Sequence, residues 1–408
     1  MPASTSGSES QCINVMFLSE EWGGLPHTVI RQFAISLAKK SNGEIKVHGY
    51  VSQSSESDRE DARKNNVNLI TASSIPCGFD SLERLRFPPP ELSHPDIVIG
   101  HGRKFGFPAY CIAKTTNCKW LQIVHVFSED LGKFKQADAE NTDTIKENEE
   151  NHKSEGALCR AADAVVSVGI LLQLVYRQVL VITPGIFEKY TNLSVQKVGQ
   201  VTNNQDDSFN IFVFAGAPFE NLYLKGYDII ADAVGYLGEK FKMTLIVGSP
   251  EGQHRKIKGW LLQTTRITRD QVTIRGYGDQ EELKTMFLEA DLVALPPGTV
   301  GFGLVALEAI SAGVPVLVTS ESGIAKALDE VEGGHLAVVK SGSPEEWVQK
   351  ITQLSMQNAE ERCAGAIRLR EEYHKTYFWD AQCAKFKEIV QGLTSRPSSA
   401  VAVGANGM

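Results

Sequence analysis

A glycine-rich stretch in the second half of the chain, PPGTVGFGLVALEAISAG from residue 296, combines residue types suited to phosphate and ribose. A predicted strand ends at residue 297, three glycines follow, and a helix is predicted over 304–312. Backbone N–H groups of such a loop, and the N-terminus of the helix after it, attract anionic phosphates. Glu308 falls about one turn into the helix, where a carboxylate can accept from ribose hydroxyls. The alternative is a tightly packed loop with Glu308 on a solvated helix face.

The elements that must position this stretch alternate between β-rich apolar runs and helical periodicity. In the first half, strands are predicted at 13–19, 45–51, 96–102, 120–127 and 162–169. In the second half, predicted strands cover 209–216, 243–249, 271–276, 291–297 and 315–320, with helices near 226–237, 254–265, 280–289, 304–312, 344–356, 359–373 and 379–393. This alternation predicts an α/β fold of two Rossmann-like, doubly wound domains, with ligands at the carboxyl ends of the strands.

Two polar stretches interrupt the pattern. Residues 194–208 are rich in Asn, Gln and Asp and are predicted to link an N-terminal domain over 12–193 to a C-terminal domain over 209–376. Residues 128–155 are highly charged, which indicates a solvated insertion or an exposed helix; binding of a protein partner is the alternative. A terminal helix is predicted over 377–393, and the ends, 1–11 and 394–408, are predicted to be disordered.

Composition excludes several classes of protein. The formal net charge of -8 gives no basic footprint for nucleic acid. No apolar run reaches the roughly 18 residues that span a bilayer, and the polar N-terminus lacks a signal-peptide pattern, so a cytoplasmic protein is expected. The seven cysteines form no C-x-x-C pair, and the second half holds no D-x-D or carboxylate cluster. We therefore expect neither a metal nor a cofactor.

The segments VTIRGYGDQEELKTMFLEADLVALPPGTVGFGLVALEAISAG, FVFAGAPFENLYLKGYDIIADAV and LIVGSPEG resemble the donor half of the family-4 glycosyltransferases. The first half resembles the acceptor domain of that family in EEWGGLPHTVIRQFAISLA, HPDIVIGH and ADAVVSVGILL, so that the resemblance runs from Ile13 to about Leu393. It implies the GT-B fold, in which the two domains face each other across a cleft and the terminal helix crosses back to the first domain.

The resemblance also implies site residues. The donor-binding set is Gly23, Gly24, Gly216, Lys225, Gly301, Phe302, Gly303, Leu304 and Glu308. His125 and Lys225 match catalytic positions, and His101 and Arg275 are further candidates. Each has a plainer interpretation: Lys225 as a surface lysine, the paired glycines as an ordinary strand-helix turn, and the histidines as core residues with satisfied hydrogen bonds.

Two residues depart from the family pattern. The first carboxylate of the Glu-x7-Glu motif is Val300 here, and the arginine expected after the first donor-domain strand is replaced by Ala217 and Pro218. Arg255 and Arg275, on neighbouring loops, are the candidate cations to approach the phosphates in place of the missing arginine. Losing two charge-assisted hydrogen bonds costs about 3–6 kcal/mol of donor or transition-state binding.

The resemblance implies transfer of a hexosyl group from a nucleotide-diphosphate sugar to an acceptor that the sequence does not identify. Retention of configuration without a metal is implied: the leaving diphosphate takes the acceptor proton, while the helix N-terminus and Lys225 stabilise its charge. The alternative is a catalytically impaired GT-B protein that binds nucleotide or serves as a scaffold. A third hypothesis is a related epimerisation or phosphorolysis.

Overall fold

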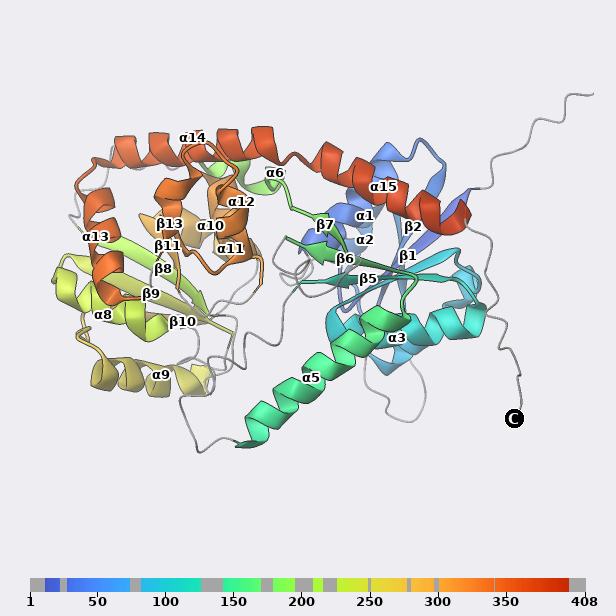
Figure 1. Ribbon diagram of the computed structural model, residues 1–408, viewed down its shortest axis with the longest axis horizontal. Coiled ribbons are helices and arrows are strands. Elements are labelled where there is room, and N and C mark those ends of the chain that lie inside the picture. Colours follow the sequence, from blue (N-terminus) through green and yellow to red (C-terminus); the bar gives the residue numbers. More distant parts are fainter. Residues whose placement is uncertain are drawn as a thin grey trace, which may run out of the picture. The chain divides into compact units, whose positions relative to one another are not determined.

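The chain divides into two compact units, one comprising residues 1–123, 155–166 and 383–408, the other 124–154 and 167–382. The computed structural model in Figure 1 describes residues 12–22, 28–73, 82–125, 142–169, 179–194, 208–215, 226–248, 251–276, 280–296, 301–340 and 342–395. Within these residues, no helix combines the length and the apolar character needed to cross a bilayer.

The first sheet has seven strands among the described residues, in the order β3-β2-β1-β4-β5-β6-β7. The strands are β1 (Ile13–Ser19), β2 (Ile45–Val51), β3 (Val67–Thr71), β4 (Ile97–His101), β5 (Lys119–Val124), β6 (Ala164–Val168) and β7 (Val179–Ile182). The helices that accompany them are α1 (Thr28–Lys40), α2 (Glu56–Lys64), α3 (Gly102–Thr116), α5 (Thr142–Ala161) and the final α15 (Trp379–Ser395). The short helix α6 (Glu188–Thr191), which follows β7, belongs to the second unit. β1 pairs in parallel with β2 and β4, and β4 pairs in parallel with β5.

The side chains of β1 point alternately to the two faces of this sheet and pack against helices on each face. Met16 and Leu18 join a buried cluster with α3, which contributes Phe105. Successive side chains of a strand point to opposite faces, so Phe17 points the other way. There its ring lies 6.2 Å from that of Phe386 in α15, which also stacks on Phe33 of α1 at 5.2 Å. Helices therefore cover the sheet on both sides.

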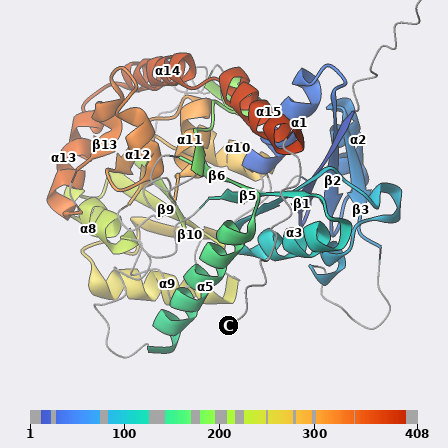
Figure 2. The same cartoon turned by 45° about the vertical axis from the view of Figure 1, so that its right-hand side comes forward.

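The second sheet has six strands in the described part of the chain, in the order β10-β9-β8-β11-β12-β13. They are β8 (Phe209–Ala215), β9 (Phe241–Val247), β10 (Val272–Gly276), β11 (Leu292–Leu295), β12 (Val316–Thr319) and β13 (Val338–Val339). The helices are α8 (Tyr227–Leu237), α9 (Glu251–Thr264), α10 (Gln280–Glu289), α11 (Leu304–Ala312), α12 (Gly323–Leu328), α13 (Pro344–Ser355) and α14 (Ala359–Thr376). Figure 2 shows α8 and α9 on one side of β9 and β10.

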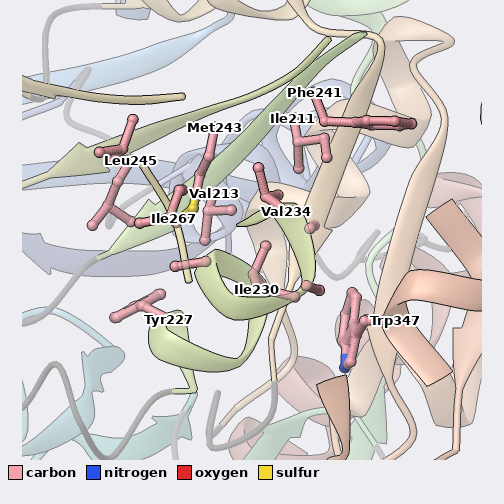
Figure 3. Close-up of a cluster of buried hydrophobic side chains, with 14 of the residues drawn as sticks. Ile211, Val213, Tyr227, Ile230, Val234, Phe241, Met243, Leu245, Ile267 and Trp347 are labelled. Atoms are coloured by element: carbon pink, nitrogen blue, oxygen red, sulfur yellow. The ribbon is translucent and has the colours of Figure 1, made fainter. Parts of the chain in front are cut away.

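The core of the second unit is an apolar cluster between this sheet and α8, α9 and α13 (Figure 3). Ile211 and Val213 of β8 meet Ile230 of α8 there, and Trp347 of α13 closes the cluster. Phe214 points to the opposite face, where its ring lies 6.0 Å from that of Phe287 in α10 and 54° from its plane. Helices on both faces of two parallel sheets confirm the predicted doubly wound fold class.

Predicted and observed elements agree closely in the second half. The helices at 280–289 and 304–312 match α10 and α11, and the other predicted boundaries in that half shift by up to three residues. The sequence did not assign the strands β3, β7 and β13, which have five, four and two residues, or the six-residue helix α12. Residues 142–155 of the charged stretch form most of α5, which continues to Ala161; residues 126–141 lie outside the described part.

Phe386→Ala tests the packing of α15. Removing this fully buried ring, which contacts two other phenylalanines, is expected to lower the free energy of unfolding by about 3–5 kcal/mol. Denaturant unfolding measures the loss. Phe378→Ala is the matched control, because that ring is 43% exposed; equal losses in the two variants would contradict the packing of Phe386.

Candidate functional site

The described end of the glycine-rich loop, residues 301–303, packs tightly against β11 and the start of α12. Gly301 and Gly303 have φ angles of 115° and 89°, in the region that favours glycine. The N–H of Gly323 donates to the carbonyl of Gly301 at 2.9 Å, and Ile324 N–H donates to the carbonyl of Phe302 at 2.6 Å. A Cβ at Gly303 would lie 2.8 Å from Leu295 Cδ2. Glycine is therefore required at Gly303 for both φ and space.

Helix α11 begins directly after this loop and is deeply buried. Gly303 is its N-cap residue, with a backbone in the left-handed region, and the first turn holds no acidic side chain. Every residue from Ala306 to Ala312 is buried. The positive end of the helix dipole is therefore not neutralised by a carboxylate of its own first turn, which favours an anion there.

Glu308 lies inside this buried segment, with only 2% of its surface exposed. The hydroxyl of Tyr190 donates to Glu308 Oε1 over 3.5 Å. Burial raises the pKa of Glu308 to about 7, while the Lys189 charge and the Tyr190 hydroxyl act in the opposite direction. The interpretation of Glu308 as a solvated helix residue is therefore wrong, and the carboxyl exchanges its proton near neutral pH.

The other loop residues have different surroundings. Phe302 is buried, and its ring packs closely against Gly169. A Cβ added to Gly169 would lie 2.7 Å from the ring atom Cδ2 of Phe302. Gly169, just after β6, has a φ of 87°. Phe302 thus packs the loop in place, whereas Gly301, Gly303 and Leu304 are partly exposed.

Four predicted donor positions, Gly23, Gly24, Gly216 and Lys225, lie outside the described residues, as does Val300. His101 is the last residue of β4 and is 5% exposed, with its ring 4.5 Å from that of Phe105. His125 directly follows β5, one residue beyond the end of the strand. Both histidines thus stand at strand carboxyl ends, where ligands bind in such sheets.

A pocket of about 690 Å³ lies at the carboxyl ends of β9 and β10. Its lining includes Gly248, Glu251, His254, Arg275, Gly276 and Glu282. The guanidinium of Arg275 pairs with Glu289 at 2.7 Å and lies over the ring of Phe212. The pocket and the glycine loop lie at the same carboxyl edge of the second sheet. They are nevertheless well separated, because β10 and β11 have two strands between them and lie about 14 Å apart.

Sequence reasoning missed two groups of residues. Tyr190 and Lys189, beside Glu308, belong to no motif and lie more than 100 positions away in the chain. Glu251 and Glu282 sit in the first turns of the helices after β9 and β10. Their position, directly after strands of a parallel sheet, was the sequence signal that could have identified these pocket residues.

Solved structures resemble this chain over nearly its whole length. A sucrose-phosphate synthase from Thermosynechococcus elongatus superposes with a TM-score of 0.68 at 17% identity, covering 93% of this chain and 99% of that one. HepE of Anabaena in complex with UDP and glucose superposes with a TM-score of 0.65 at 15% identity, covering 93% and 100%. At these identities the likeness establishes the fold.

Curated relatives match over shorter ranges. A D-inositol 3-phosphate glycosyltransferase from Corynebacterium urealyticum is 30% identical over 181 residues, which are 43% of this chain and 42% of that protein. The one from Paenarthrobacter aurescens is 29% identical over 222 residues, 52% of each chain. The chain thus spans about half the length of these relatives.

The paired parallel-sheet domains and these structural likenesses define the class of the protein as a GT-B fold. A family described as "Family 4 Glycosyltransferase in conflict systems" matches residues 18–386. The chain belongs to this family, which confirms the predicted resemblance.

Gly303→Ala tests the close packing of the loop around Gly303. A methyl group at this φ and this distance from Leu295 is expected to destabilise the second unit by about 1–3 kcal/mol, measured by denaturant unfolding. The control is Gly365→Ala in α14, where a Cβ has nothing within 4 Å and alanine is expected to stabilise the helix by about 0.5–1 kcal/mol. An unchanged free energy of unfolding in Gly303→Ala would contradict the close packing at this position.

Glu308→Gln tests the buried carboxyl. Because its pKa is raised from 4.5 to about 7 in the folded chain, the unfolded chain loses this proton first, and the carboxyl costs stability as pH rises from about 5 to 7. Glu308→Gln is therefore expected to match the parent near pH 5 and to be more stable at pH 8 by on the order of 2–3 kcal/mol. The exposed Glu371→Gln is the control; a pH-independent difference for Glu308→Gln would contradict the assignment.

Proposed function

We propose that this protein transfers a hexosyl group from a nucleotide-diphosphate sugar to an acceptor, with retention of configuration and without a metal. The observation that carries the proposal is the unit formed by the Gly301–Leu304 loop, the uncapped N-terminus of α11 and the buried Glu308, at the carboxyl edge of a parallel sheet. Membership of a glycosyltransferase family and likeness to GT-B structures over 93% of the chain favour transfer over a scaffold role.

The proposed donor site uses two kinds of group. The loop and the first turn of α11 present N–H groups and a positive dipole end to the diphosphate. Glu308 accepts hydrogen bonds from the ribose hydroxyls, about one turn further along. Lys225 adds a cation, as the family resemblance implies. The departing diphosphate then takes the acceptor proton, while these donors stabilise the charge that develops on it.

The relatives indicate which compounds to test first. HepE has been solved with UDP-glucose, and a trehalose-phosphate synthase from Burkholderia xenovorans with glucose-6-phosphate. The curated relatives are named for an inositol phosphate acceptor. We therefore propose UDP-glucose as the first donor and phosphorylated sugars or cyclitols as the first acceptors.

Ligand binding and turnover test the proposal together. A nucleotide sugar at 100 times its Kd is expected to stabilise the chain by about 2.7 kcal/mol, seen as a rise in Tm of several degrees. Incubation with an acceptor is expected to release nucleoside diphosphate and form a glycoside of unchanged anomeric configuration, read by NMR. Glu308→Ala is expected to weaken donor binding about 10-fold or more.

The outcomes separate the hypotheses. Equal shifts with bare nucleotide and with its sugar conjugates, and no product from any acceptor, would support the impaired nucleotide-binding protein instead. Product without added acceptor would support epimerisation or phosphorolysis. Absence of any shift across UDP, GDP, ADP and their conjugates would contradict the proposed donor site.

A further inference from the structure

We propose that Tyr190 is the positioning residue for Glu308: its hydroxyl holds one carboxylate oxygen so that the other faces the donor. This inference rests on the proposed function, because it assigns Glu308 to the ribose. It adds a residue that no motif identifies, on a short helix far from the glycine loop in the sequence. Three features of the second unit carry it.

The first feature is a clamp between α6 and α11. The N–H of Phe187, just before α6, donates to Ser311 Oγ at 3.0 Å, and that hydroxyl donates to the carbonyl of Leu307 at 2.7 Å. Arg370 Nη1 donates to the carbonyl of Thr191 at 3.2 Å and to that of Ser311 at 3.4 Å. One guanidinium thus joins the ends of both helices, so α6 is fixed relative to Glu308.

The second feature is the packing of the Tyr190 ring, which is fully buried. The ring meets Phe287 edge-on, with centroids 5.6 Å apart and planes at 86°. Lys189 Nζ lies 4.7 Å from the centre of the same ring. Phe287 is itself held by Phe214 of β8. Because the ring cannot turn without disturbing these contacts, the direction of its hydroxyl is set by the core.

The third feature is the chemistry of a buried carboxyl. A carboxylate has two oxygens and about four lone-pair sites, and a single phenol hydroxyl satisfies one of them. The Tyr190 hydroxyl contacts Oε1, and the proposal assigns Oε2 to a ribose hydroxyl. A phenylalanine at position 190 would fill nearly the same volume, so packing alone does not require the hydroxyl.

The charges around Glu308 come from few elements. Helices α6, α12 and α14 and strands β11 and β12 pack against α11. Lys189 and Tyr190 on α6 favour the ionised carboxyl. Arg370 of α14 donates to the carbonyl of Ser311, near the end of α11. Lys326 of α12 pairs with Asp329, the C-cap residue of its own helix. The described segments of β11 and β12 carry no ionisable side chain.

Tyr190→Phe and Tyr373→Phe form a matched pair. Tyr373 is equally buried in the same unit, and its hydroxyl donates to the carbonyl of Pro184 at 2.9 Å, away from Glu308. Both variants lose one buried hydrogen bond, so both are expected to lower Tm. Only Tyr190→Phe is expected to raise the donor KM, by about 5- to 10-fold with kcat little changed.

The pH dependence gives a second readout. The Tyr190 hydroxyl lowers the pKa of Glu308, so its removal raises that pKa, and the low-pH fall of kcat/KM is expected to begin at a higher pH in Tyr190→Phe. Lys189→Met is expected to shift the fall in the same direction, and Lys189→Arg to restore it. Equal KM values and pH profiles in the Tyr190 and Tyr373 variants would overturn the inference.

A direct titration separates this inference from the proposed function. The carboxyl carbon of Glu308, labelled with 13C and assigned by its loss in Glu308→Gln, reports its ionisation by NMR without any substrate. A titration midpoint unchanged by Tyr190→Phe would overturn the contact, whatever the enzyme does. A raised midpoint in a chain that binds no nucleotide would instead leave the contact standing and refute the proposed function.

Discussion

The burial of α11 is the constraint on which the candidate site depends. From Ala306 to Ala312 the helix has no solvent-facing side, so every polar group on it needs a partner within the protein or from a ligand. Ser311 meets this need with a backbone N–H and a carbonyl. Glu308 meets it with a phenol hydroxyl on one oxygen.

The same burial explains the glycines in front of the helix. Gly301 and Phe302 lie beside the start of α12, and their carbonyls accept hydrogen bonds from the first two N–H groups of that helix. Leu295 and Ile324 leave no room for a Cβ at Gly303. Around Gly303 the backbone is therefore tightly enclosed by side chains of β11 and α12.

Electrostatics adds a second effect at this site. Glu308 has a pKa of about 7 because burial outweighs a nearby ammonium and a hydroxyl. Such a group changes charge within the physiological range, unlike an exposed glutamate. If Glu308 binds ribose as proposed, the ribose hydroxyls donate to the ionised carboxyl and favour it, so that ligand binding and proton release are coupled at this position.

The sequence by itself determined the strand and helix order, the fold class, the glycine loop and the placement of Glu308 in the first turns of α11, because these depend on local periodicity and on residues adjacent in the chain. It did not determine β3, β7 or β13, because these short strands of five, four and two residues give little periodic signal. Only the tertiary structure decided that Glu308 is buried, that Tyr190 and Lys189 lie beside it, and that Arg275 pairs with Glu289. Burial and pKa depend on which distant segments pack together, and no pattern of neighbouring residues contains that information.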